Sequence, residues 1–330
     1  MKVAIVGAGF CGLAVAWNLL KRFPDVTVTL YDKNGIGGGA SGIAAGLLHP
    51  FSGAHAKLNR KGFEGIEETK QLLNIASDAL NEPVISVNKG ILRLALTQLQ
   101  EGDFKFCAKN HPNETAWLDS DECQKLIPQC TAVPGLWIKD GITVHCLKYL
   151  NGLWKACEKK GAQLVIQSIE NLQVLNTFDQ IILTIGSGFK YLPELKLPLT
   201  FVKGQVLELQ WPLDIPPLNY PINSNTYIAM KEGNQSCFVG ATYERDFSHE
   251  FEDIEIAKNE LLSKAIELYP PLKDSQILKS YAGVRVSTPN HLPIIKEISP
   301  NQWILTGMGS KGLLYHALYA KELVDNLYNQ

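Results

Sequence analysis

The spacing of apolar positions changes twice within the first 32 residues, and each spacing predicts an element. Val3–Val6 is an unbroken apolar run, which is typical of a short strand buried on both faces. The apolar positions that follow recur at helical spacing until Pro24. A second apolar run, Val26–Tyr31, predicts another strand and ends at Asp32. The chain therefore opens with a strand, a helix and a strand.

The rest of the chain continues this mixture of elements without an internal repeat or a low-complexity tract. Helical spacing predicts further helices at about 55–76, 147–157 and 251–269, and from residue 313 onward. Strands are expected at 163–167, 180–185 and 303–306 and at several places within 202–241. Residues 83–140 show both patterns. This order of elements predicts an α/β fold.

The composition is that of a globular protein, and it removes several function classes. Of 330 residues, 45% are hydrophobic, and 31 Lys and Arg against 33 Asp and Glu give a net charge of -2. No overall charge therefore attracts the chain to nucleic acid. The seven cysteines lack CxxC spacing, so we expect neither a metal site nor a disulfide framework.

The apolar runs of the sequence do not have the form of a membrane helix or a signal peptide. No apolar run approaches the roughly 18 residues of a membrane helix. Glycines interrupt the apolar N-terminus where a signal peptide would have its core. We expect a cytoplasmic protein without a membrane span, and we leave its oligomeric state open.

Gly7, Gly9 and Gly12 form a G-x-G-x-x-G motif between the first predicted strand and helix. In a dinucleotide site the first glycine permits the tight turn, the second lets the backbone approach the pyrophosphate, and the third lets helix and strand pack closely. A purely structural glycine turn is the alternative, but here strand, turn, helix, strand and acid follow in order. We predict a dinucleotide site in which Asp32 accepts hydrogen bonds from ribose hydroxyls and disfavours a 2′-phosphate.

The segment Gly37–Arg60 begins almost without side chains and then becomes polar. A nicotinamide enzyme would continue with another strand–helix–strand unit, whereas this chain passes Lys33 and enters a glycine-dense loop. Bare backbone beside a dinucleotide site can lie against a flat ring, which favours FAD over NAD. His49 and Phe51, where larger side chains resume, are candidates for the wall of a substrate pocket. A flexible surface loop is the alternative.

These motifs resemble the FAD-dependent D-amino acid oxidase-like (DAO) family of amine oxidoreductases. The family's A-S-x-x-x-x-G-x loop matches Ala40–Leu47. The later Pro50 and Leu58–Arg60 echo the flavin domains of the tRNA 5-methylaminomethyl-2-thiouridine biosynthesis proteins within that family. The resemblance implies a bound FAD in contact with these loop residues and their neighbour: Lys33, Ala40, Ser41, Gly46 and Leu47.

Residues 281–295 resemble the family's A-G-x-R segment followed by x-x-P-x-I. The resemblance implies that Arg285 holds a substrate carboxylate, for which a guanidinium offers a planar bidentate fork. Tyr227 aligns by position with a family tyrosine near that carboxylate, and Lys203-Gly204-Gln205 resembles the R-G-Q motif that leads into the substrate-domain sheet. A surface salt bridge is the alternative for Arg285, and core packing is the alternative for Tyr227.

A second G-x-G-x-x-G follows the strand predicted at 303–306 and leads into the last helix. The resemblance implies that this helix start and one further glycine turn lie at the flavin: Gly307, Gly309, Ser310, Lys311 and Gly312, with Gly186. Helix N–H groups and Lys311 would favour negative charge on the reduced ring, or Lys311 would reach the substrate; an exposed turn lysine is the alternative. Small-amine relatives such as glycine oxidase carry an arginine where this chain has Ser310.

The resemblance implies two discontinuous domains. Residues 1–80, 141–200 and 281–330 would form an FAD-binding Rossmann-like domain. Residues 81–140 and 201–280 would form a mixed α+β substrate domain with an antiparallel sheet.

The implied function is oxidation of the C–N bond of a carboxylate-bearing secondary amine or amino acid, by hydride transfer to FAD and without an obligatory side-chain base. A sharper version removes the carboxymethyl group from carboxymethylaminomethyl-uridine in tRNA. The alternatives are a glycine, sarcosine or D-amino acid oxidase or dehydrogenase, and a non-catalytic FAD-binding protein. The tRNA-modifying relatives carry a methyltransferase domain before the flavin domain, and we expect any such partner activity to lie elsewhere. The electron acceptor and the mode of flavin attachment stay open.

Overall fold

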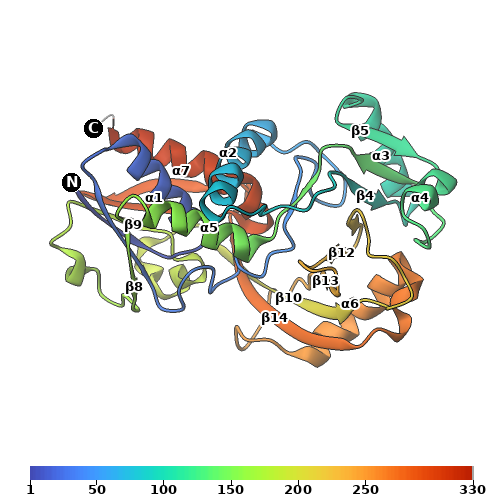
Figure 1. Ribbon diagram of the computed structural model, residues 1–330. Coiled ribbons are helices and arrows are strands. Elements are labelled where there is room, and N and C mark those ends of the chain that lie inside the picture. Colours follow the sequence, from blue (N-terminus) through green and yellow to red (C-terminus); the bar gives the residue numbers. More distant parts are fainter. Residues whose placement is uncertain (329–330) are drawn as a thin grey trace.

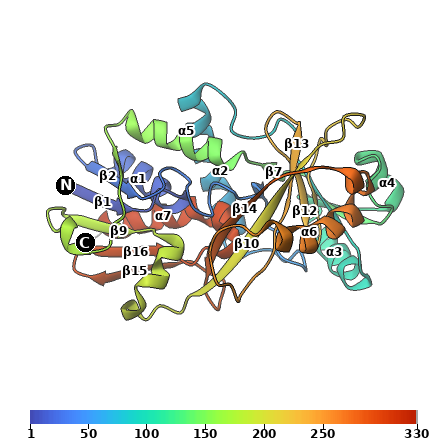
Figure 2. The same cartoon turned by 90° about the horizontal axis from the view of Figure 1, so that it is seen from below.

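Two β-sheets lie side by side in the computed structural model, which describes residues 1–328 (Figures 1 and 2). The first sheet has six strands in the order β15–β16–β9–β1–β2–β8. In that order their bounds are Ile294–Ser299, Gln302–Thr306, Gln180–Leu183, Lys2–Val6, Thr27–Asp32 and Gln163–Ile166. Neighbouring strands are parallel except β15 and β16, which pair antiparallel.

The second sheet has eight strands in the order β14–β10–β13–β12–β11–β4–β6–β5. In that order their bounds are Ile277–Ser287, Thr200–Gln210, Ser236–Gly240, Tyr227–Met230, Ile222–Asn223, Ile91–Leu94, Gly135–Ile138 and Thr115–Leu118. Only β11 and β4 pair parallel within this sheet of the described chain. A short pair, β3 (Leu47–Leu48) and β7 (Ile142–Thr143), stands apart. The parallel first sheet and the antiparallel second sheet confirm the predicted fold class.

Four helices pack together against the six-stranded sheet: α1 (Phe10–Arg22), α2 (Gly62–Leu80), α5 (Cys146–Glu158) and α7 (Gly312–Tyr328). Side chains of a strand point alternately to its two faces. In β1, Val3 and Ile5 belong to the core that these helices form, whereas Ala4 and Val6 belong to a second core on the other face. Both faces of β1 are thus covered, which explains its unbroken apolar run.

The other three helices pack on the eight-stranded sheet: α3 (Gln98–Asn110), α4 (Ser120–Leu126) and α6 (Ile254–Leu268). Two predicted helix starts were too early. The predicted start at 55 moves to Gly62, because Ala56 and Lys61 have left-handed backbone, with φ of 47° and 54°. The predicted start at 251 moves to Ile254, because Asp253 Oδ1 accepts the N–H groups of Glu255 and Ile256, both at 3.1 Å.

The strands of each sheet come from separate parts of the sequence. The six-stranded sheet takes its strands from residues 2–32, 163–183 and 294–306, and the eight-stranded sheet takes its strands from 91–138 and 200–287. Strand β14 therefore crosses the boundary predicted at residue 281. The division into two domains stays a prediction. Within residues 1–328 no helix has the length and apolar character needed to cross a membrane.

A hydrogen-bonded histidine is buried between α1, α5 and α7. His316 Nδ1 lies 3.0 Å from the carbonyl oxygen of Gly312, and His316 Nε2 lies 2.7 Å from Tyr149 Oη. A carbonyl can only accept, so Nδ1 carries the proton and Nε2 accepts from Tyr149. Burial lowers the pKa of His316 to about 4, although hydrogen bonds to Gly312 and Leu313 oppose this. The side chain is therefore neutral near pH 7.

Replacing two helical glycines should give effects of opposite sign. A Cβ on Gly65 of α2 would lie 2.3 Å from the carbonyl oxygen of Leu314 in α7, whereas nothing lies within 4 Å of a Cβ on Gly102 of α3. Gly65→Ala should lower the free energy of unfolding by about 1–3 kcal/mol because it pushes α2 away from α7. Gly102→Ala should raise it by about 0.5–1 kcal/mol through helix propensity. Urea unfolding followed by circular dichroism measures both; equal shifts would contradict this packing.

The protein should become less stable as the pH falls from about 6.5 to 4. The folded pKa of His316 is depressed to about 4, so in this window the unfolded state binds the proton that the folded state excludes. His316→Gln should reduce the slope of unfolding free energy against pH by up to about 1.4 kcal/mol per pH unit. Tyr149→Phe is the control: it removes the hydrogen bond but keeps the titrating group, so the slope should persist. Chemical denaturation at several pH values, at constant FAD concentration, measures it.

Candidate active site

A cavity of about 400 Å³ lies between the two sheets, at the carboxyl ends of β1, β9 and β16. Most of its wall comes from residues within 9–11, 40–49, 184–186, 204–206, 283–286 and 305–313. Ser52, Gly53, Asn223, Tyr227 and Ala241 complete it. Ligands of open α/β sheets bind outside the carboxyl ends of the parallel strands. The cavity therefore lies at the edge of the sheet where the glycine motif predicts a dinucleotide.

The first glycine motif packs strand, turn and helix with no room for side chains. Gly7 has φ of +109°, and a Cβ there would lie 2.4 Å from the carbonyl oxygen of Thr184. A Cβ on Gly12 would lie 1.8 Å from the carbonyl oxygen of Gly7. Thr184 Oγ1 lies 3.0 Å from the carbonyl oxygens of Val6 and Gly7. Gly7 and Gly12 thus seat α1 against the sheet, while Gly9 lies in the cavity wall.

The start of α1 is open toward the cavity. Its N-cap is Gly9, which has no side chain to cap the helix, and Ser41 Oγ accepts the N–H of Phe10 at 3.2 Å. Asp32 is held beside the same turn, since its carboxylate accepts the N–H groups of Ala8 at 2.9 Å and Asn34 at 2.8 Å. Asp32 itself lies outside the cavity wall, next to the glycine turn.

The loop of small residues contacts both the segment just after β7 and strand β14. Ala40, Ser41, Gly46 and Leu47 all lie in the cavity wall. Gly46 has φ of +78°, and a Cβ there would lie 1.9 Å from the carbonyl oxygen of Val144. On the other side, a Cβ on Gly283 of β14 would lie 2.8 Å from the Cα of Ala40. The loop therefore reaches β14 through backbone contact that only a glycine permits.

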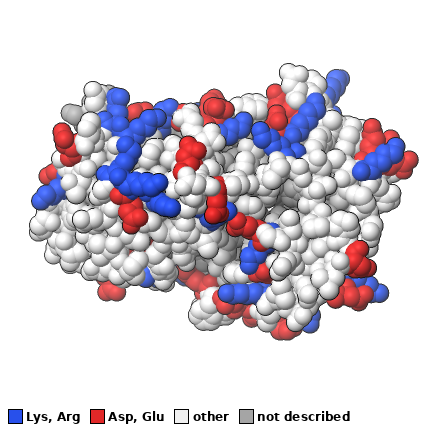
Figure 3. Space-filling model, in the orientation of Figure 1, with Lys and Arg blue, Asp and Glu red and all other residues white. Residues whose placement is uncertain are grey.

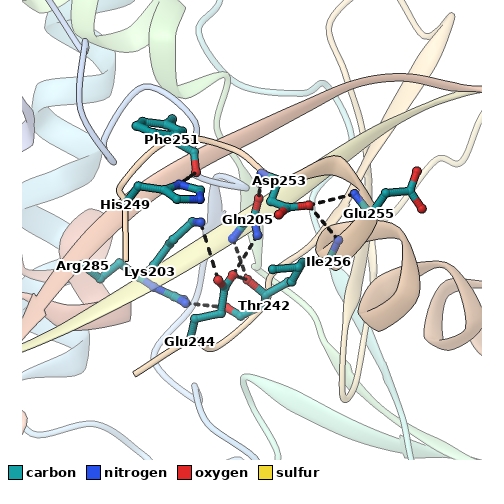
Figure 4. A network of polar contacts seen from close by, with 10 residues as sticks. All are labelled: Lys203, Gln205, Thr242, Glu244, His249, Phe251, Asp253, Glu255, Ile256 and Arg285. Carbon is teal, nitrogen blue, oxygen red and sulfur yellow. Dashed lines mark hydrogen bonds and ion pairs between the residues drawn. The ribbon is translucent and has the colours of Figure 1, made fainter. Parts of the chain in front are cut away.

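Arg285 reaches the cavity across the face of β10. A Cβ on Gly204 would lie 2.5 Å from Arg285 Nη2, so Gly204 leaves the space that the guanidinium fills. Nη2 donates to the carbonyl oxygen of Thr242 at 2.8 Å (Figure 4). The guanidinium lies 5.5 Å from the centre of the Tyr243 ring. Nε is buried without a partner. Burial lowers the pKa of Arg285, but the side chain keeps its charge.

Two neutral polar side chains share the wall with Arg285. Tyr227 stands opposite Asn223 and Gly240 in its sheet, and burial raises its pKa. His49 is only 6% exposed, and its Nδ1 is buried without a hydrogen-bond partner. Burial, with the charge of Arg93 as a second cause, lowers the pKa of His49 to about 3. At neutral pH the wall therefore holds one cation beside a phenol and an uncharged imidazole.

Several predicted residues lie outside the wall. The ring of Phe51, expected in the wall of a substrate pocket, is fully buried in a core with Ile91 and Phe104, and Phe51 is not among the residues that line this cavity. Its backbone is held by Arg93, whose Nη1 and Nη2 donate to the carbonyl oxygens of Phe51 and Gly53, both at 2.6 Å. Ser52 and Gly53 reach the cavity instead.

Most of the residues predicted at the flavin from the second glycine motif and the turn at Gly186 line the cavity. Gly186, Gly307, Gly309, Ser310 and Gly312 line the cavity. Lys311 does not: its Nζ lies 5.9 Å from the centre of the Tyr315 ring, and burial lowers its pKa. Lys33 is exposed to solvent. Sequence reasoning also missed Thr184, which lies in the wall, and Thr242, which holds Arg285.

The donor set fits a dinucleotide joined to a flat ring. The N-cap of α1, Gly9, has no side chain, and helix starts of this kind offer N–H groups to phosphates. Asp32 beside it can face a ribose, and the bare loop from Ala40 to Leu47 offers backbone to a ring system. The unpartnered Nδ1 of His49 and Nε of Arg285 leave hydrogen-bonding capacity for a smaller polar molecule in the same cavity.

Two proteins with similar sequences are bifunctional proteins longer than this chain. The bifunctional protein ThiO/ThiG of Nostoc sp. is 26% identical over 99% of this chain and 53% of its own length. The tRNA 5-methylaminomethyl-2-thiouridine biosynthesis bifunctional protein MnmC of Hydrogenovibrio crunogenus is 27% identical over 96% of this chain and 50% of its own length. The chain thus spans about half the length of these relatives.

A solved structure has the same fold over almost the whole chain. Glycine oxidase from Geobacillus kaustophilus superposes with a TM-score of 0.84, covering 99% of this chain and 95% of the oxidase at 23% identity. That identity supports the fold alone. The sequence pattern of one family, described as FAD dependent oxidoreductase (DAO), matches residues 2–326. The chain therefore belongs to the DAO family of FAD-dependent oxidoreductases.

Proposed function

We propose that this enzyme oxidises the C–N bond of an amine or amino acid that bears a carboxylate. The observation that carries the proposal is Arg285. Its guanidinium lies in the cavity wall, its Nε has no hydrogen-bond partner, and within residues 1–328 no carboxylate forms an ion pair with it. Arg285 is half-buried, and a charge partly withdrawn from water favours an ionic partner. A substrate carboxylate supplies the missing partner.

FAD, when bound, supplies the acceptor for the two electrons of the oxidation. The start of α1 and Asp32 would hold its nucleotide part, and Ala40, Ser41, Gly46 and Leu47 would lie against its ring. The start of α7, with Gly307, Gly309, Ser310 and Gly312, would present N–H groups to the ring's edge. Lys311 lies outside the wall and would act there only through its charge.

The chain's own residues would bind and orient the substrate. Arg285 would hold the carboxylate, and the Tyr227 hydroxyl beside it would add a hydrogen bond. The uncharged imidazole of His49 can accept a hydrogen bond from the substrate's N–H without repelling Arg285. No side chain is required as a base, because orientation of the amine in a closed site supplies much of the rate.

Two candidate substrates of different size are considered, a modified tRNA and a small amino acid. Similarity to MnmC favours carboxymethylaminomethyl-uridine in tRNA, which carries a carboxylate on a secondary amine. Against tRNA stand the net charge of -2 and the mixture of Lys and Arg with Asp and Glu on the face shown in Figure 3. Similarity to the bifunctional protein ThiO/ThiG favours a small amino acid. All seven cysteines are free, which supports the expectation of a cytoplasmic enzyme.

Anaerobic bleaching of the flavin distinguishes these substrates. The FAD-loaded protein is mixed with glycine, sarcosine, iminodiacetate or D-amino acids, and separately with tRNA carrying carboxymethylaminomethyl-uridine. Bleaching by a small amine alone assigns an amino-acid oxidase or dehydrogenase, and bleaching by the tRNA alone assigns a modification enzyme. Bound FAD that no amine reduces would favour the non-catalytic alternative.

Removing the guanidinium should weaken binding of whichever substrate bleaches the flavin. Arg285→Met should raise its KM by about 30-fold or more, the loss expected for one partner of a buried charged pair. Arg245→Met is the matched control, because Arg245 lies 5.6 Å from the centre of the same Tyr243 ring but is exposed outside the cavity wall. Steady-state kinetics measures both variants. Equal KM values for Arg285→Met and the unmodified protein would refute carboxylate binding by Arg285.

A further inference from the structure

Four polar residues behind Arg285 form a network that lies outside the cavity wall (Figure 4): Lys203, Gln205, Thr242 and Glu244. Arg285 Nη2 donates to the carbonyl oxygen of Thr242 at 2.8 Å. That carbonyl sits on a segment just after β13, so the direction of the guanidinium depends on how this segment is held.

Thr242 is held by its neighbour on β10. Its N–H donates to the carbonyl oxygen of Gln205 at 3.1 Å, and its Oγ1 accepts the N–H of Gln205 at 2.8 Å. The Thr242 hydroxyl in turn donates a hydrogen bond to Glu244 Oε1 at 2.6 Å. Every polar group of Thr242 is thus engaged, and Glu244 receives the last of its hydrogen bonds.

Glu244 is tied to β10 by both backbone and side chain. Glu244 and Lys203 exchange backbone hydrogen bonds, each 2.9 Å long. Glu244 Oε1 accepts from Gln205 Nε2 at 2.9 Å, and Glu244 Oε2 lies 3.6 Å from Lys203 Nζ. Lys203 is only 1% exposed, so this is a buried ion pair.

A buried ion pair contributes little net stability, because desolvation of the two charges offsets their attraction. Its effect here is geometric and electrostatic. It fixes the segment 242–244 against β10, and it neutralises Lys203, so that Arg285 remains the unpaired cation at the cavity. A free Glu244 carboxylate would compete with the substrate for that guanidinium.

We propose that Lys203 and Glu244 are positioning residues for Arg285, and that affinity for the substrate carboxylate depends on their ion pair. This inference rests on the proposed function. Through Glu244 and Thr242, the pair sets where the guanidinium points, although neither Lys203 nor Glu244 touches the substrate.

The test uses the FAD-loaded full chain, with acetate as the carboxylate probe. Acetate binding is measured from the change it causes in the flavin absorption spectrum. Glu244→Gln keeps the side-chain size and one oxygen acceptor but removes the charge. Because it leaves Lys203 buried without a partner, the double variant Lys203→Met/Glu244→Gln is measured beside it. Both should raise the Kd of acetate by about tenfold, the loss expected when charge-assisted hydrogen bonds are misplaced.

Glu208→Gln is the matched control for a merely structural effect. Glu208 lies on β10, as Lys203 does, and it is buried outside the cavity wall. Its carboxylate accepts hydrogen bonds from Lys231, Ser236 and Tyr281. It should lose comparable thermal stability while keeping the acetate Kd within about twofold. Equal weakening in Glu208→Gln, or an unchanged Kd in both Glu244 variants, would overturn the inference.

Kinetics with the bleaching substrate supplies a second readout. The Glu244 variants should raise its half-saturating concentration and keep the limiting rate of flavin reduction within about threefold, since binding rather than chemistry is affected. A fall in the limiting rate alone would also overturn the inference. Arg285→Met separates the two proposals. If Arg285→Met and both Glu244 variants bind acetate normally, the proposed function fails. If only Arg285→Met binds acetate weakly, the role of the ion pair is rejected and the proposed function stands.

Discussion

A half-buried cation in the wall of a cavity places strict demands on its surroundings, and the rest of this site can be understood from Arg285. Its guanidinium needs space, which Gly204 leaves, and an acceptor, which the carbonyl of Thr242 supplies. It also needs a counter-charge, and the nearby carboxylate of Glu244 is engaged by Lys203, Gln205 and Thr242. What is left is an electrostatic requirement that a ligand must meet.

Close backbone contact brings the two halves of the site together. The turn after β1 packs on Thr184, and the loop of small residues packs on Val144 on one side and on β14 on the other. At Gly7, Gly46 and Gly283 a Cβ would lie less than 3 Å from backbone of the opposing segment. Such contacts cannot adjust as long side chains do, so the helix start and small-residue loop proposed to hold the cofactor keep a fixed position relative to Arg285.

Local patterns predicted the elements and motifs but not every contact of the site. The glycine turns and the strands around them depend on neighbours in sequence, so G-x-G-x-x-G and the A-G-x-R segment located most of the cavity wall. Phe51 is different, because Arg93, far away in sequence, holds its backbone and leaves its ring in a core. The role of Thr242 was equally invisible: a backbone carbonyl carries no residue signature. The helix predicted from about residue 55 begins later, at Gly62, for a local reason: the left-handed backbone at Lys61.

Gly283 and Arg285 lie two residues apart on β14, and therefore point to the same face of the sheet. Gly283 contacts the small-residue loop, and Arg285 presents its charge to the cavity. Their separation along the strand is about 7 Å. Strand β14 pairs with β10 from Thr200 to Leu209, so it cannot slide to change this distance. The fold therefore fixes the distance between the small-residue loop and the Arg285 guanidinium. Under the proposed function, this distance would set how far the substrate carboxylate lies from the carbon that is oxidised.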